Sequence, residues 1–154
     1  MKNVGIMILT IILSVIGLNA QESLVYENGQ FYDADKNLVK GEYTTRYSDG
    51  NTEAIYNLEN GILNGKAVFY YSTGEKQEIG FFKNGEKHGT WVKWNPQGQK
   101  VGEANYYFGE KDGEWRIWDD EGTLRYHLIY DKGDKVGVWK IWDAKGKVIS
   151  EREY

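Results

Sequence analysis

The chain has 154 residues, a formal net charge of −4 and no cysteine, which allows one modest domain and excludes disulfides and thiolate metal sites. Its 19 basic and 23 acidic side chains are mixed, so no concentrated basic face is expected to bind nucleic acid or to bind an anionic membrane strongly. The 19 glycines, 12 tyrosines and 6 tryptophans beside one proline predict many turns between aromatic-rich strands.

The N-terminus has the pattern of a secretory signal. Lys2 is followed by an apolar run over residues 4–18, and small Ala20 is followed by polar Gln21. The run is shorter than the roughly 20 residues that a membrane span needs. We predict a signal peptide over residues 1–20, cleavage before Gln21, and an exported protein that is periplasmic, at the cell surface or secreted. An uncleaved N-terminal anchor is the alternative.

Glycine recurs with a period of 24 residues. A first column holds Gly41, Gly65, Gly89, Gly113 and Gly137. A second column holds Gly50, Gly74, Gly98, Gly122 and Gly146. A third column holds Gly61, Gly85, Gly109 and Gly133. We expect these glycines at turns or bulges, many with positive φ. The period predicts five units, over residues 41–64, 65–88, 89–112, 113–136 and 137–154.

Residues 21–40 are expected to form a divergent half-unit that begins the array. Asn37 falls in the third glycine column one period early, and Asn is the next-best residue for a left-handed backbone conformation. Gly29 falls outside the three columns. On this ground we expect Gly122→Val to destabilise the protein more than Gly29→Val.

The aromatic residues follow the same period. One column holds Tyr43, Ala67, Trp91, Trp115 and Trp139. A second, three residues later, holds Arg46, Tyr70, Trp94, Trp118 and Trp142. A third holds Leu58, Phe82, Tyr106, Tyr130 and Tyr154. All six tryptophans therefore lie in the last three units. Their odd spacing either points them to opposite faces of a sheet or requires a bulge that brings them to one face.

Each unit is expected to form one β-hairpin. In the fourth unit, a strand over residues 114–118 ends in a turn at Gly122, a second strand covers residues 124–131, and a Gly-x-x-x-Gly segment reverses the chain. The predicted fold is all-β, an elongated antiparallel array of tandem 24-residue hairpins with about ten strands in total. Residues 148–154 should form the terminal edge strand, and their charges should keep the protein monomeric.

The segment Phe82-Lys83-Asn84-Gly85-Glu86-Lys87-His88-Gly89-Thr90-Trp91, repeated from Tyr106 and from Tyr130, resembles the MORN repeat, and more closely its bacterial variant. The resemblance covers residues 40–154. Bacterial proteins of this type are often grouped with YwqK-like antitoxins, which are thought to neutralise a partner toxin by binding it. The resemblance implies a binding protein and supplies no catalytic residues.

Catalytic and metal chemistry find little support. His88 and His127, the two histidines, lie 39 residues apart in different units. The acidic run over residues 119–121 occupies a turn before Gly122, where Asp serves backbone hydrogen bonding. We therefore expect no enzyme activity, no metal site and no cofactor.

The predicted function is a protein-binding scaffold, which would include toxin neutralisation. The partner-binding candidates are the six tryptophans, Trp91, Trp94, Trp115, Trp118, Trp139 and Trp142. Their rings are either the core of the array or an exposed platform. A cell-envelope glycan- or choline-binding module is the alternative function, because aromatic rows also stack on sugars and cage quaternary ammonium groups.

Overall fold

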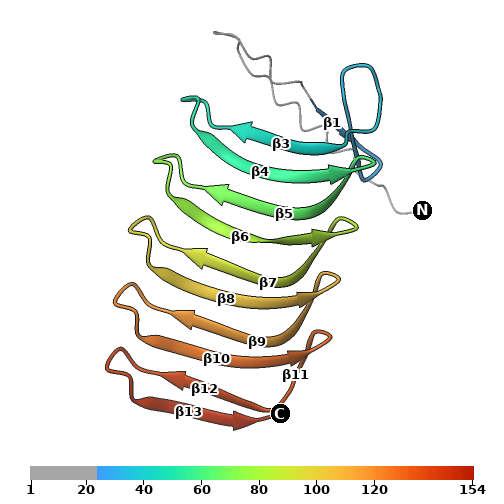
Figure 1. Cartoon of the computed structure of the whole chain (residues 1–154). Helices are drawn as coiled ribbons and strands as arrows, with labels where there is room; N and C mark the ends of the chain where they lie inside the picture. Colours follow the sequence, from blue (N-terminus) through green and yellow to red (C-terminus); the bar gives the residue numbers. More distant parts are fainter. Residues whose placement is uncertain (1–23) are drawn as a thin grey trace, which may run out of the picture.

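Short aromatic and β-branched segments alternate with glycine turns along this chain, and nearly every such segment forms a strand (Figure 1). The computed structural model describes residues 24–154, so the expected signal segment over residues 1–20 lies outside the described residues. The expected all-β fold is confirmed, and the part of the chain that is described contains no helix. It therefore also contains no helix that could span a membrane.

The strands pair in chain order. The main sheet runs β13-β12-β10-β9-β8-β7-β6-β5-β4-β3, with short β11 beside β10, and β1 and β2 form a separate hairpin. The first strands are β1 (Val25–Glu27), β2 (Gln30–Tyr32), β3 (Gly41–Arg46), β4 (Thr52–Glu59), β5 (Ile62–Tyr70) and β6 (Lys76–Lys83). The others are β7 (Glu86–Trp94), β8 (Lys100–Tyr107), β9 (Glu110–Trp118), β10 (Leu124–Asp131), β11 (Asp134–Lys135), β12 (Val138–Trp142) and β13 (Val148–Glu153).

Two kinds of turn join these strands, and both depend on positive φ. Within a unit, Gly122 has a φ of 82° and its N–H donates to the carbonyl of Asp119, whose carboxylate accepts the N–H of Thr123. Between units, Asn60 and Gly61 both have positive φ, 50° and 72°, as a type I′ hairpin turn requires. All 14 glycines of the three columns have positive φ, as expected.

The Gly-x-x-x-Gly segment does not reverse the chain as a whole. Of the two glycines in Gly85 to Gly89, only Gly85 lies in the turn, beside Asn84, whereas Gly89, with a φ of 70°, lies inside β7. Ile79 and Phe81 pair with Val92 and His88, so four residue steps of β7 face two of β6. The second glycine therefore forms a bulge that bends the strand.

The half-unit before the array differs from the expected alignment. Positive φ falls on Lys36 (64°) and not on Asn37, so the alignment of Asn37 with the third column was wrong. Gly29 has the same φ as Gly122, 82°, and lies with Asn28 in a turn of the inter-unit type. The reason for expecting Gly29→Val to be the milder substitution therefore does not hold.

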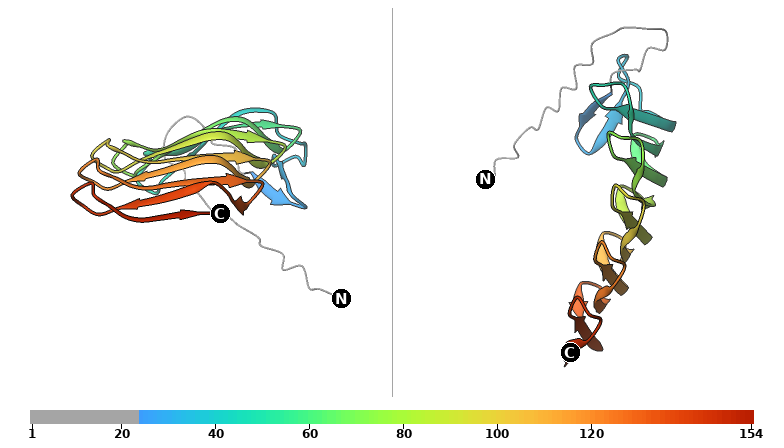
Figure 2. Two further views of the ribbon diagram at one scale, coloured as in Figure 1. Left: turned by 90° about the horizontal axis from the view of Figure 1, so that it is seen from below. Right: turned by 90° about the vertical axis from the view of Figure 1, so that its left-hand side faces the viewer.

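The result is a single curved layer of strands with no second layer over the described residues (Figure 2). Hydrogen bonds repeat from unit to unit, because the N–H groups of Gly85, Gly109 and Gly133 donate to the carbonyls of Leu63, Lys87 and Lys111 at 2.8, 2.9 and 2.8 Å. Few apolar side chains are fully buried, among them Leu58, Ala67 and Trp91. As expected, the last strand, β13, forms an edge of the sheet.

Candidate interaction surfaces

The two tryptophan columns lie on opposite faces of the sheet. Strand β7 pairs without interruption with β8 from Gly89 to Lys93, so Trp91 points to one face and Trp94, three residues later, to the other. The bulge that shifts the register near Trp94 lies in β8 and leaves the alternation of β7 intact. We call the face of Trp91, Trp115 and Trp139 the ladder face and the other the reverse face.

The ladder face carries a series of aromatic contacts along the array. Trp115 lies between Tyr106 and Tyr130, with ring centroids 5.1 and 5.5 Å away, and Trp139 lies between Tyr130 and Tyr154 at 5.1 and 4.8 Å. The edge-to-face and tilted geometries are those that aromatic pairs prefer. Burial in this stack raises the pKa of Tyr106. The third aromatic column thus joins each tryptophan of the first column to the next.

Lysine ammonium groups occupy the spaces beside these rings. Lys111 Nζ lies 4.6 and 4.8 Å from the ring centroids of Trp115 and Tyr130. The equivalent Lys87 Nζ lies 3.7 Å from the Trp91 ring centroid and 5.3 Å from that of Tyr106. This lysine therefore links the rings around Trp91 to the rings that begin at Tyr106. Lys135 repeats the arrangement with Trp139 and Tyr154. Each lysine therefore occupies the position beside the rings that a quaternary ammonium ligand would need.

The indole N–H groups of the same column are used in the fold. Those of Trp91, Trp115 and Trp139 donate to backbone carbonyls ten residues earlier, at 3.2, 2.9 and 2.8 Å. Trp91 is only 2 % exposed, and Trp115 and Trp139 are half-buried. The tryptophans of this column are therefore part of the packing that holds the array together.

Two small residues explain why the second unit lacks a tryptophan in this column. Ala67 is fully buried and pairs with Gly80, which lies beneath the indole of Trp91. A Cβ on Gly80 would lie 2.1 Å from the Trp91 ring, so no larger residue fits there. The small side chain of Ala67, next to Gly80, therefore leaves room for the Trp91 ring.

The second tryptophan column lies half-buried on the reverse face. Trp94 and Trp118 pair with Lys100 and Leu124 within their hairpins, and Lys100 Nζ also lies 4.4 Å from the Trp118 ring centroid. Trp142 pairs with Val148 at the edge of the sheet. These rings keep part of their surface in solvent and remain candidates for contact with a partner.

A single row of cross-strand neighbours crosses the reverse face from β3 to β13. Its members are Thr44, Ile55, Val68, Ile79, Val92, Glu103, Arg116, His127, Lys140 and Glu151. The row is apolar from Ile55 to Val92 and polar or charged from Glu103 onward. The reverse face therefore has an apolar first part and a polar second part.

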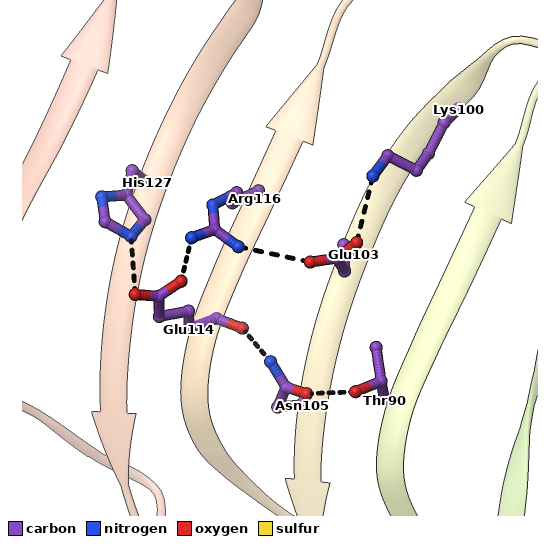
Figure 3. Close-up of polar contacts among 7 residues, drawn as sticks. All are labelled: Thr90, Lys100, Glu103, Asn105, Glu114, Arg116 and His127. Atoms are coloured by element: carbon purple, nitrogen blue, oxygen red, sulfur yellow. Dashed lines mark hydrogen bonds and ion pairs between the residues drawn. The ribbon is translucent and has the colours of Figure 1, made fainter.

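The charged part of this row is an ion-pair network (Figure 3). Glu103 binds Lys100 at 3.0 Å and Arg116 at 3.3 Å, and Arg116 also contacts Glu114. His127 Nε2 is buried without a hydrogen bond and lies 3.8 Å from Glu114. The hydrogen bond from Lys100, with help from the nearby Arg116 charge, lowers the pKa of Glu103.

The two histidines remain apart in the fold, since His127 belongs to this network and His88 lies on β7 beside Tyr107 and Phe108. Within residues 24–154, no group of three or more His, Asp or Glu side chains is arranged to hold a metal ion. In the acidic run, Asp119 accepts a backbone N–H and Asp120 accepts a hydrogen bond from the Asn95 amide at 2.9 Å. The turn role expected for this run is thereby confirmed.

An exposed apolar patch lies on the ladder face of the last units, and the sequence analysis did not single it out. Ile117, Tyr126 and Ile141 are consecutive cross-strand neighbours on β9, β10 and β12. Ile117 is 38 % exposed and Tyr126 is 39 % exposed, whereas Ile141 is half-buried. We call these three residues the ladder-face patch. At the equivalent positions the other units place Thr45, Phe69 and Lys93 in the column of Ile117 and Ile141, and Ala54, Glu78, Gly102 and Ser150 in the column of Tyr126. Only the last units therefore have large apolar residues at all three neighbouring positions.

These features define a protein built of tandem β-hairpins. The family model described as MORN repeat variant matches residues 63–84, 111–132 and 135–154. The matches begin 48 and 24 residues apart (111 − 63 and 135 − 111), which are whole multiples of the period. The three matched segments are therefore similar to the MORN repeat variant. No curated protein matches the chain significantly.

Proposed function

We propose that this protein is an exported, non-catalytic scaffold that binds another protein. MORN repeats are modules that often mediate binding to proteins or membranes. The observation that carries the proposal is the ladder-face patch, because Ile117 and Tyr126 expose apolar surface that nothing in the described fold covers. Contiguous exposed apolar side chains beside charged ones are typical of protein interfaces.

The lysines of the ladder face favour a protein over choline as the ligand. In the ladder, Lys87, Lys111 and Lys135 already place their ammonium groups against the tryptophan and tyrosine rings. A choline group would have to displace a tethered cation from each site. Toxin neutralisation, which the resemblance to the antitoxin group suggests, is one form that the proposed protein binding would take.

The test compares capture of proteins from the source cell envelope by the wild type and by a patch variant. The variant Ile117→Lys, Tyr126→Ser and Ile141→Thr uses residues that the array itself places in these columns, so it should fold. A matched control, Val25→Ser with Tyr26→Ser, removes apolar side chains that are 51 % and 50 % exposed at the other end. We expect mass spectrometry to show a protein captured by the wild type and control and lost by the variant. Equal capture by all three would contradict the proposal.

A further inference from the structure

A group of aromatic side chains lies on the reverse face near the inter-unit turns of β6 to β9, with two of them exposed and two, His88 and Phe108, half-buried. Phe81 is 54 % exposed and is the cross-strand neighbour of His88. The His88 ring lies 5.3 Å from Tyr107 and 4.8 Å from Phe108, and Tyr107 is 49 % exposed. We call Phe81, His88, Tyr107 and Phe108 the turn cluster.

The repeats themselves show that the fold does not require these rings. In the columns of His88, Tyr107 and Phe108 the other units carry polar or small apolar residues. The Phe81 column holds Asn57, Asn105, Ile129 and Glu153 in the other units. The same backbone is thus built without an aromatic residue at any of the four positions.

Phe108 has an additional conformational cost. It is the first residue of a type I′ turn and has a φ of 44°, where the equivalent turns place Asn28, Asn60, Asn84 and Lys132. Asn tolerates the left-handed region well, whereas a bulky aromatic residue there is uncommon and strained. Strain that persists without a structural need is a reason to look for a function.

The charges around the cluster indicate what it binds. Lys66 is the cross-strand neighbour of Phe81, and Lys83 Nζ lies 5.2 Å from the Phe108 ring centroid. Both lysines are exposed, and neither belongs to an ion pair within the described part of the chain. Glu86 and Glu110 are the cross-strand neighbours of Lys83 and Tyr107 in the turns, so the basic side of the cluster is the side of Lys66.

We infer that the turn cluster is a docking site for a protein segment with an aromatic side chain next to carboxylates. The aromatic side chain would stack on the exposed rings, and the carboxylates would reach Lys66 and Lys83. The inference rests on the proposed protein-binding function but uses a different face of the sheet. The patch variant described above leaves this site intact, so the two proposals can fail independently.

The test uses the full chain and three short synthetic peptides. One carries a tryptophan flanked by aspartates, one carries the tryptophan flanked by lysines, and one carries alanine flanked by aspartates. Backbone amide shifts in NMR spectra report where each binds. We expect saturable shifts at the turn cluster with the acidic tryptophan peptide, and at least a tenfold weaker response with the other two.

Column residues supply variants that keep the fold. Tyr107→Lys with Phe108→Asn should abolish the response to the acidic tryptophan peptide and raise the melting temperature, because the strain at Phe108 is removed. Lys66→Glu should weaken binding at least threefold. The control Lys132→Asn changes the same turn position one unit later and should bind as the wild type does. An unchanged response in Tyr107→Lys with Phe108→Asn, equal binding of the lysine peptide, or no binding of the acidic peptide would overturn the inference.

Discussion

At the scale of the residue, the two tryptophan columns have different roles. Trp91 is almost fully buried, its ring contacts those of Phe69 and Phe82, and its indole N–H is hydrogen-bonded. Trp94 lies on the other face and keeps part of its surface in solvent. Both residues belong to repeated tryptophan columns, so the repeat pattern alone does not distinguish them. They differ only because successive side chains of a strand point to opposite faces of the sheet.

We predict that Trp91→Ala lowers the free energy of unfolding by about 3–5 kcal/mol, as expected for loss of a buried large aromatic side chain. Trp94→Ala serves as the matched comparison and should cost clearly less. Chemical denaturation of both variants measures the difference. Equal losses would show that the two faces are packed alike and would contradict the assignment of the core to the ladder face.

A second prediction concerns Glu103, whose pKa is lowered in the folded protein by the hydrogen bond from Lys100. A carboxyl group with a lowered folded-state pKa stabilises the protein above its ordinary pKa of 4.5, and this contribution is lost as the pH falls through the folded-state pKa. Glu103→Gln should therefore be less stable than the wild type at neutral pH. The difference should shrink in acid, as thermal unfolding across pH can show. A difference in stability that does not change with pH would show that the ionised Glu103 carboxylate does not stabilise the fold.

At the scale of the element, the glycine turns and the strand alternation made most of the fold predictable. The exact 24-residue spacing of the three glycine columns made the number and order of the hairpins predictable, because a glycine with positive φ is hard to replace, whether it lies in a turn or at a bulge. The bulge at Gly89 was harder to predict, since a glycine in a turn and a glycine in a bulge look alike in sequence.

The half-unit and the exposed surfaces could not be predicted in the same way. Lys36 occupies a left-handed position without being glycine, so the glycine pattern fails there. The exposure of Ile117, Tyr126 and Phe81 depends on which face of the sheet the aromatic rings cover, and the spacing of the residues does not determine that face.

The edge strand β13 gives the third prediction. All of its residues are exposed, and its Glu151 forms an ion pair at 3.3 Å with Lys140 on the neighbouring strand β12. Charged side chains on an edge strand oppose pairing with another chain. Replacing Glu151, Arg152 and Glu153 with Thr should produce oligomers, which light scattering detects. A strictly monomeric variant at high concentration would show that other features protect this edge.

At the scale of the whole molecule, the array is a single layer whose units contact only their neighbours, as in other repeat proteins. The ladder of rings and lysines holds one face together along the chain. Surface not needed for that ladder, such as the ladder-face patch, is free to vary between units. The residues that hold the fold are therefore distinct from the residues that would bind a partner.

The most direct test of this separation measures melting temperature and partner capture on the same two variants. Trp115→Ala removes a ladder ring and should lower the melting temperature strongly. The patch variant of Ile117, Tyr126 and Ile141 should melt within a few degrees of the wild type, because Ile117 and Tyr126 are exposed, and substitutions at exposed positions change stability by only about 0.5 kcal/mol each. It should nevertheless lose the captured protein. A patch variant that stays folded and captures the partner as well as the wild type does would contradict the central claim.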